Sequence, residues 1–208
     1  MSALPYPAAT LSVDYPDKPR DRLSVFFRIF MVIPIMIIFA LISGGSSDRA
    51  DNTGYYWGAG GIIFAAVVLM ILFRQKYPRW WFDWNAALTR FAFRVFSYLD
   101  LLRDEYPSTD EEQAVHLGLA YPDVKRDLNR WLPLVKWFLA IPHYIALAFL
   151  EVAAVVCVII AWLAILFTGS YPRGLFDFVV GVMRWGLRVY AYAFLLISDR
   201  YPPFSLDA

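Results

Sequence analysis

The chain contains two copies of one pattern, and this repetition limits what it can fold into. Tyr-Pro-Asp, Arg-Asp and Ile-Pro follow one another over residues 15–34 and again over residues 121–142. A second block, from Tyr-Pro-Arg and Phe-Asp to Leu-Leu and Tyr-Pro, occurs over residues 73–107 and again over 167–202. So many matches in a fixed order exceed what composition alone would give. We therefore expect two structural repeats.

The matches divide the chain into four parts. The expected parts are an N-terminal tail at residues 1–14, a first repeat at 15–107, a polar linker at 108–120 and a second repeat at 121–204.

The composition is that of a membrane protein. The chain is 60% hydrophobic and 18% charged, whereas a soluble domain is about half apolar and about a quarter charged. A net charge of +1 argues against nucleic acid as a partner. One cysteine and two histidines exclude an intramolecular disulfide and a His/Cys zinc site, so we expect no metal and no cofactor.

Basic residues are distributed unevenly along the chain. Of 19 Lys and Arg, only Arg49 lies in the loop at 43–54. The positive-inside rule places basic segments on the cytoplasmic side of a membrane. We therefore expect a multi-pass protein of the bacterial inner membrane with both termini in the cytoplasm. The basic segments are 18–28, 74–103, 125–136 and 173–200.

Apolar runs of membrane-spanning length begin each repeat. Val25–Ile42 and Tyr55–Phe73 are each near the roughly 20 residues that cross a bilayer, and they predict a transmembrane hairpin at 23–73. Residues 132–168 form one longer run, which as a single helix would measure about 55 Å. We therefore predict a second hairpin there.

The alignment of the two repeats places the turn of the second hairpin. It sets Glu151 opposite Ser43, where the first loop begins, so we predict that the chain turns back near Glu151. Pro34 and Pro142 lie inside the first helix of their hairpins and predict a kink in each.

The third element of each repeat is an amphipathic helix, expected at 80–103 and at 174–197. An acidic residue is followed by one arginine seven positions later and another four positions after that, so the three charges share a helical face. A buried arginine in a membrane costs at least about 2.5 kcal/mol, which favours an interfacial helix over a crossing. The charged sets are Asp83, Arg90 and Arg94, and Asp177, Arg184 and Arg188.

The predicted fold is therefore an all-α membrane protein of two parallel repeats. Each repeat is a transmembrane helical hairpin followed by an amphipathic interfacial helix, which makes four crossings in all.

The two arginine pairs are the strongest candidates for a binding site. Guanidinium groups suit phosphate or carboxylate, and at the interface the available anion is a lipid headgroup. The alternative is a salt bridge between the repeats. Within one helix Asp83 is about 10 Å from Arg90, too far for contact, but Asp83 could reach Arg184 or Arg188 of the other repeat. Both hypotheses stay open.

Two polar residues lie inside the second apolar run. Glu151 is either a solvated turn residue or a functional acid of the membrane interior. His143 is either a packed side chain or part of a proton relay. No motif of a catalytic residue set appears in the sequence.

The motifs resemble a bacterial integral-membrane family known only as a domain of unknown function. The resemblance rests on Tyr171-Pro172-Arg173, Phe176-Asp177, Arg184-Trp185, Arg188-Val189 and Tyr201-Pro202 and on their first-repeat counterparts. It implies no substrate and no catalytic residue.

These observations favour a non-enzymatic membrane scaffold or an accessory or assembly subunit that organises anionic lipid at the cytoplasmic interface. The alternative is an oligomeric channel or transporter built from parallel repeats. The expected partners are membrane lipid and either further copies of the chain or a larger membrane complex.

Overall fold

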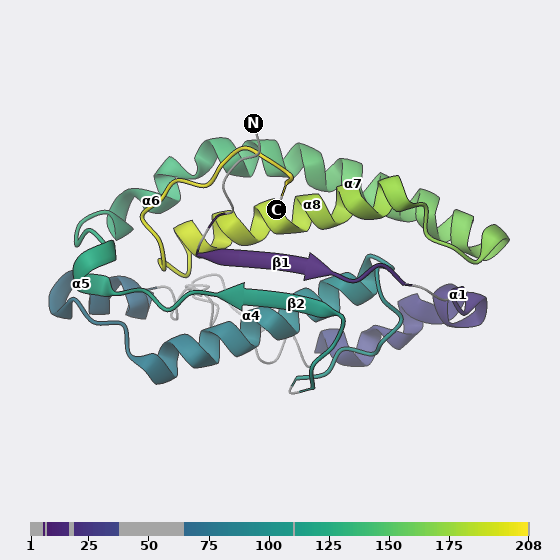
Figure 1. Cartoon of the computed structure of the whole chain (residues 1–208), viewed down its shortest axis with the longest axis horizontal. Helices are drawn as coiled ribbons and strands as arrows, with labels where there is room; N and C mark the ends of the chain where they lie inside the picture. The colour runs from purple at the N-terminus through teal and green to yellow at the C-terminus, as the bar shows by residue number, and fades with distance from the viewer. Residues whose placement is uncertain (1–5, 7, 17–18, 38–64, 110, 208) are drawn as a thin grey trace, which may run out of the picture.

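A two-stranded antiparallel sheet lies at the centre of the structure, with helices on either side of it (Figure 1). The structure is a computed structural model that describes residues 6, 8–16, 19–37, 65–109 and 111–207. Strand β1 spans Ala9–Val13 and strand β2 spans Val115–Leu119. The labelled helices are α1 (Arg22–Met31), α4 (Arg79–Leu99), α5 (Val124–Asp127), α6 (Pro133–Leu139), α7 (Ile141–Thr168), α8 (Arg173–Ala193) and a short π-helix, η1 (Met70–Arg74).

The sheet corrects the prediction of an all-α fold. β1 lies in the expected N-terminal tail, and β2 lies in the expected polar linker. Both strands alternate buried apolar with exposed positions, which is the pattern of a strand with one covered face. The alternation is a weak signal in the sequence, because each strand has only five residues and its partner lies about a hundred residues away.

The strand register is symmetric about one residue pair. Leu11 lies opposite Leu117, and the flanking pairs run outward from there to Ala9 with Leu119 and Val13 with Val115. Leu11 and Leu117 are 106 positions apart, the same separation as the tyrosines of the two Tyr-Pro-Asp motifs. The sheet therefore joins the two halves of the chain through matching positions.

One helix covers each strand. α8 packs against β1 and α4 packs against β2, so the sheet lies between these two helices (Figure 1). α7 packs along α8, and α1 and α6 contact the α7–α8 pair. The main hydrophobic core contains residues from both strands and from α8.

The second predicted hairpin is wrong. α7 is one helix of 28 residues that continues through Glu151, and its end is Gly169, which has a left-handed φ of 77°. The sequence around Glu151 contains no glycine or proline that would stop a helix. Within the described residues, α7 is the one helix long and apolar enough to cross a membrane, so the prediction of four crossings is wrong as well.

The kink predicted at Pro142 is also corrected. α6 ends at Leu139, and Pro142 lies in the first turn of α7. A proline in the first turn lacks only an N–H group that would have no helical partner anyway, so it starts this helix instead of bending it.

The first predicted hairpin falls largely outside the described residues, since residues 38–64 include its loop and parts of both crossings. Before residue 38, α1 ends at Met31 and residues 33–37 are helical. After residue 64, the apolar helix Ala65–Arg74 ends in η1.

The two amphipathic segments are helices, although shorter than expected. α4 starts after Pro78 and α8 after Pro172, each proline having the extended backbone that precedes a helix. They end at Leu99 and Ala193, four residues before the expected ends.

The tyrosines of the Tyr-Pro motifs form hydrogen bonds and cation–π contacts between the two halves. The hydroxyl of Tyr15 donates to the carbonyl of Tyr171 at 2.5 Å, and the hydroxyl of Tyr121 donates to the carbonyl of Tyr77 at 2.5 Å. Each of these tyrosines also packs under an arginine, with Arg173 4.3 Å from the Tyr15 ring centre and Arg79 4.7 Å from that of Tyr121. Each half thus anchors the first turn of the other half's helix.

We predict that Tyr15→Phe and Tyr121→Phe each lower the free energy of unfolding by about 1 kcal/mol, because each leaves a carbonyl at a helix start without its donor. Tyr106→Phe is the matched control, because Tyr106 is exposed like Tyr121 but its hydroxyl makes no hydrogen bond among the described residues, and it should change stability by less than about 0.5 kcal/mol. Thermal unfolding in detergent measures all three. Equal effects of the three substitutions would contradict the anchoring role.

Candidate functional site

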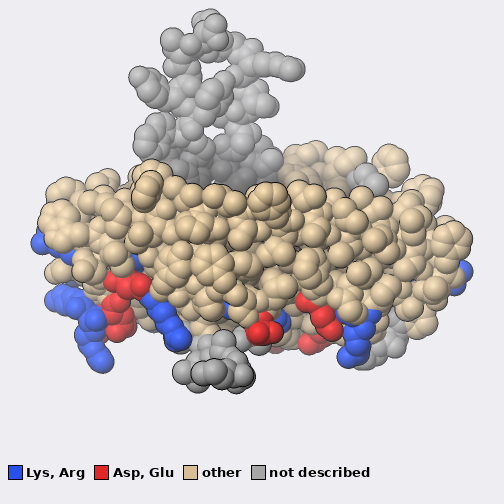
Figure 2. Space-filling view, turned by 90° about the horizontal axis from the view of Figure 1, so that it is seen from above, with Lys and Arg blue, Asp and Glu red and all other residues tan. Residues whose placement is uncertain are grey.

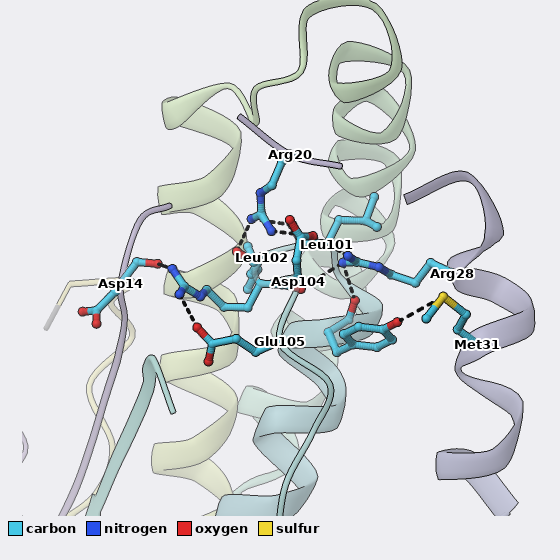
Figure 3. Close-up of polar contacts among 10 residues, drawn as sticks. Asp14, Arg20, Arg28, Met31, Leu101, Leu102, Asp104 and Glu105 are labelled. Atoms are coloured by element: carbon cyan, nitrogen blue, oxygen red, sulfur yellow. Dashed lines mark hydrogen bonds and ion pairs between the residues drawn. The ribbon is translucent and has the colours of Figure 1, made fainter. Parts of the chain in front are cut away.

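The most strongly charged buried site holds two arginines on one carboxylate (Figure 3). Arg20 Nη1 lies 2.8 Å from Asp104 Oδ1, and Arg28 Nη2 forms an ion pair with the same oxygen. The arginine side chains are 2% and 3% exposed, while Asp104 is 34% exposed. Burial lowers the pKa of Arg20, and Asp104 opposes that shift. One carboxylate therefore balances two buried cations.

Backbone carbonyls at the end of α4 supply the remaining acceptors. Arg20 donates to the carbonyls of Leu101, at 2.9 Å, and Leu102. Arg28 donates to the carbonyls of Tyr98 at 3.1 Å and Arg103 at 2.9 Å, and it lies over the Tyr98 ring at 4.4 Å. Carbonyls at a helix C-terminus have no helical partner and carry partial negative charge, so cations stabilise them.

The second half contains a related site with a lysine. Lys136 is fully buried, its Nζ lies 2.7 Å from Asp199 Oδ1, and it donates to the carbonyl of Ser198 at 2.8 Å. It lies 5.2 Å from the ring centre of Tyr192. Burial lowers the pKa of Lys136, and Asp199 opposes that shift.

The Asp104 and Asp199 ion clusters connect the ends of α4 and α8 to the segments that follow these two helices. Lys136 stands 108 positions after Arg28, the same offset that relates Pro34 and Pro142. Arg126, which matches Arg20, is exposed. The sequence contained a signal for these sites, because a single basic residue interrupts the apolar run at the same place in each half.

The predicted arginine pairs bind backbone rather than carboxylates. Arg90 Nε donates to the carbonyl of Leu117 at 3.2 Å, and Arg184 Nε donates to that of Leu11 at 3.0 Å. These two leucines form the central pair of the sheet. Each helix therefore caps the strand that the other half supplies.

The second arginine of each pair binds the segment that follows its helix. Arg94 Nη1 donates to the carbonyl of Ser108 at 2.8 Å. In the other half, Arg188 donates to the carbonyl of Asp207, while Arg184 Nη1 donates to that of Leu206 at 3.0 Å. Burial lowers the pKa of both Arg184 and Arg188.

The predicted salt bridge between α4 and α8 does not form in the described part of the chain. Asp83 instead lies 3.6 Å from Arg79 of its own helix, and both side chains are exposed. Asp177 is near enough to Arg184 to favour that cation's charge. The physical reason is the sheet, which separates the two helices (Figure 1).

His143 and Glu151 lie on α7 in different surroundings. His143 is fully buried, accepts a hydrogen bond from Trp185 Nε1 at Nδ1 over 3.0 Å, and stacks on Phe204 with 4.0 Å between ring centres. This is the environment of a packed residue.

Glu151 is exposed on the helix surface and does not lie at a turn. No group of three or more metal-ligating side chains occurs in the segments that the structure describes.

We predict that Asp199→Asn lowers the free energy of unfolding by about 3 kcal/mol at pH 7, because it leaves the buried Lys136 cation without its carboxylate. The pKa of Lys136 then falls further below its ordinary value of 10.5. At pH values between the lowered pKa of Lys136 in the folded variant and 10.5, the unfolded chain binds more protons than the folded chain, so the stability of the variant rises with pH. The deficit should shrink between pH 7 and pH 10.

Asp104→Asn is the matched control for this pH dependence. Its partners are arginines, which stay charged across the whole range, so its deficit should not shrink. Thermal unfolding of both variants at several pH values makes the comparison. A pH-independent deficit in Asp199→Asn would show that Lys136 keeps its charge without the carboxylate.

We also predict that Gly181→Ala destabilises the protein by about 1 to 3 kcal/mol through overpacking. A Cβ at Gly181 would lie 2.9 Å from Leu206 Cβ and 3.2 Å from the Leu206 carbonyl oxygen. Gly186→Ala on the same helix is the control, because no atom lies within 4 Å of its added Cβ. It should stabilise the helix by up to about 1 kcal/mol. Thermal unfolding that shows the same sign for both would refute this account.

The comparisons with known proteins identify one match. Residues 131–205 match the model of a domain of unknown function, DUF4389. No curated protein and no solved structure matches the chain. The matched segment contains α6, α7 and α8 together with the Lys136 cluster and most of the segment that covers α8. This part of the chain thus contains a domain of unknown function, which agrees with the expected resemblance to an uncharacterised family.

Proposed function

We propose that this protein is a non-enzymatic scaffold embedded in a membrane, with its apolar helices lying in the plane of one leaflet. The observation that carries the proposal is the surface of α7. Membrane lipid is the partner that would cover this surface.

α7 combines extreme hydropathy with exposure. The mean hydropathy of its most apolar stretch is 2.8, and only 17% of that stretch is buried. An apolar helix in a soluble protein is normally buried, and large exposed apolar patches mark contact with lipid or protein. Its exposed large side chains are Ile145, Phe149, Val152, Val155, Val156, Ile159, Ile160, Leu163 and Phe167.

The helices next to α7 extend this apolar surface. α1 exposes Leu23, Phe26, Phe27 and Phe30, and the region of α6 exposes Trp131, Leu134, Val135, Trp137 and Phe138. Tryptophan is enriched at membrane interfaces because its ring is apolar and its N–H group is polar. Lipid contact would explain the whole surface with one partner.

The distribution of charge supports an in-plane orientation. In the face that Figure 2 shows, most Lys, Arg, Asp and Glu gather along one long edge, a few Lys or Arg lie at the two short ends, and the broad middle shows none. That edge runs parallel to the long axis of the molecule, as α7 does in Figure 1. A membrane with its headgroups at the charged edge would place α7 along the bilayer.

The length of α7 points the same way. Its 28 residues span about 42 Å at about 1.5 Å per residue. The hydrocarbon core is about 30 Å thick, so a crossing would require a tilt at or beyond the usual upper limit of about 40°.

A scaffold role is supported by the way the halves are joined. Buried ion clusters at Asp104 and Asp199 fix the ends of α4 and α8, and both halves contribute a strand to one sheet. Such a body holds its surfaces in a fixed relation, which is what a platform for lipid or for other subunits needs. Assembly into homo-oligomers or a larger complex is part of this proposal.

We predict that spin labels at Phe149, Val156 and Leu163, introduced as cysteines in a Cys157→Ala background, report nearly equal depths in lipid. These positions are seven residues apart and exposed, so they share one face of α7. Electron paramagnetic resonance with oxygen and a water-soluble relaxant measures the depth in nanodiscs. A label at Lys125, exposed on α5, gives the aqueous reference.

Two results would decide against this placement. Depths that rise to a maximum at the central label and fall on either side would mean that α7 crosses the bilayer. Labels as accessible to the water-soluble relaxant as Lys125 would mean that the apolar surface is covered by protein and not by lipid.

A further inference from the structure

A cavity of about 560 Å³ lies beside α4 and β2 in the first half of the molecule. It is large enough for a small organic ligand. Most of its lining is polar. The lining residues are Thr10 and Ser12 of β1, Ala87, Arg90 and Arg94 of α4, Thr109, Glu112 and Gln113 of the following segment, and Val115, His116, Leu117 and Gly118 of β2.

The two arginines of α4 give this cavity its binding chemistry. Arg94 is 9% exposed, and its buried Nε has no hydrogen-bond partner in the described part of the chain. A buried guanidinium N–H without an acceptor is costly, and a negative charge in the cavity would offset that cost. Arg90 is exposed, and among the described residues its one hydrogen bond runs from Nε to the carbonyl of Leu117. Its outer nitrogens remain able to meet a ligand.

The matching place in the second half is filled by the chain itself. There the segment after α8 covers the helix, and the carbonyls of Leu206 and Asp207 bind Arg184 and Arg188. The close approach of Leu206 requires glycine at position 181. At the matching position in α4 the residue is Ala87, which is exposed and lines the cavity.

The difference follows from the direction of the chain after each helix. The segment after α8 turns back over its own helix, and Phe204 stacks on His143 there. The segment after α4 leaves through Ser108 toward β2, so Arg94 obtains one carbonyl. The contacts on α8 therefore show what the arginines of α4 lack, which is an oxygen acceptor in the place that the Leu206 carbonyl takes beside Arg184.

We propose that the cavity beside α4 is a binding site for a phosphate-bearing ligand, whose oxygens take the place that the Leu206 carbonyl holds beside Arg184 on α8. Arg90 and Arg94 supply the charge, and the hydroxyls of Thr10 and Thr109 supply neutral donors at the wall. The volume leaves room for the rest of a soluble phosphate ester or of a lipid headgroup. The site does not depend on the membrane role, because inorganic phosphate alone tests it.

One lining residue opposes an anion and thereby supplies a test. Glu112 is exposed at the cavity wall. Its carboxylate repels the ligand, so Glu112→Gln should tighten phosphate binding by about twofold, as expected for one exposed charge. A variant that gains affinity cannot be explained by misfolding.

The experiment follows the arginine Nε–H signals of the ¹⁵N-labelled protein in zwitterionic micelles. Inorganic phosphate is titrated at constant ionic strength, and short-chain phosphatidylglycerol is titrated separately against phosphatidylcholine. Arg94→Gln identifies the Arg94 signal. A shift of that signal with phosphate indicates a soluble ligand, and a shift with phosphatidylglycerol alone indicates a lipid headgroup. Both results support the site.

Matched variants complete the test. Ala87→Glu places a carboxylate one turn from Arg90 and should weaken binding at least tenfold, whereas Ala87→Gln, of the same length without charge, should weaken it less. Arg188→Gln changes the filled site and should leave binding unchanged. The proposal is overturned if neither probe shifts the Arg94 signal, or if Ala87→Glu binds as the unaltered protein does. A loss of binding in Glu112→Gln would also overturn it.

Discussion

The structure depends on two strands that, within the described part of the chain, have each other as their one strand neighbour. In an antiparallel pair, alternate residues direct their backbone groups away from the partner strand. The hydrogen bonds Asp14–Ala114 and Ala120–Ala8 set this alternation, and they leave the Leu11 and Leu117 carbonyls facing outward. Arg184 and Arg90 bind these two carbonyls. A two-stranded sheet is only marginally stable alone, so the arginines that cap its edges bind the halves together.

This requirement explains why matching positions of the two halves behave alike at the sheet and differently beyond it. Arg90 and Arg184 bind matching edge carbonyls, those of Leu117 and Leu11. Arg94 and Arg188 stand one turn further along, where the chain after each helix takes its own course. The residues at the matching positions Gly181 and Ala87 differ accordingly. The surface of α8 at Gly181 is covered by the backbone of Leu206, whereas the surface of α4 at Ala87 borders the open cavity.

The sequence predicted the places of α4 and α8 and the importance of their arginines, but not what the arginines bind. A Tyr-Pro-Arg turn is a local signal, and the apolar periodicity that follows it continues for a full helix. Every residue has a backbone carbonyl, so the sequence cannot indicate which carbonyl an arginine binds. The acidic side chains of Asp83 and Asp177 were the partners that residue type could suggest, and the salt bridge was therefore predicted with them. The turn placed at Glu151 failed for a related reason. It rested on the alignment of Glu151 with Ser43, whereas the local sequence is uninterrupted by glycine or proline and favours helix.

The buried cations are compatible with an apolar surface only because their charge is matched nearby. Arg28 and Lys136 lie on helices whose outer faces expose phenylalanine, leucine and tryptophan. Each cation is directed inward to a carboxylate, to at least one backbone carbonyl and to the face of a tyrosine ring. In the proposed membrane placement, an unmatched charge at this depth would draw water or headgroups into the apolar layer. Arginine or lysine at this position therefore anchors each helix to the polar interior and leaves the outer surface of that helix apolar.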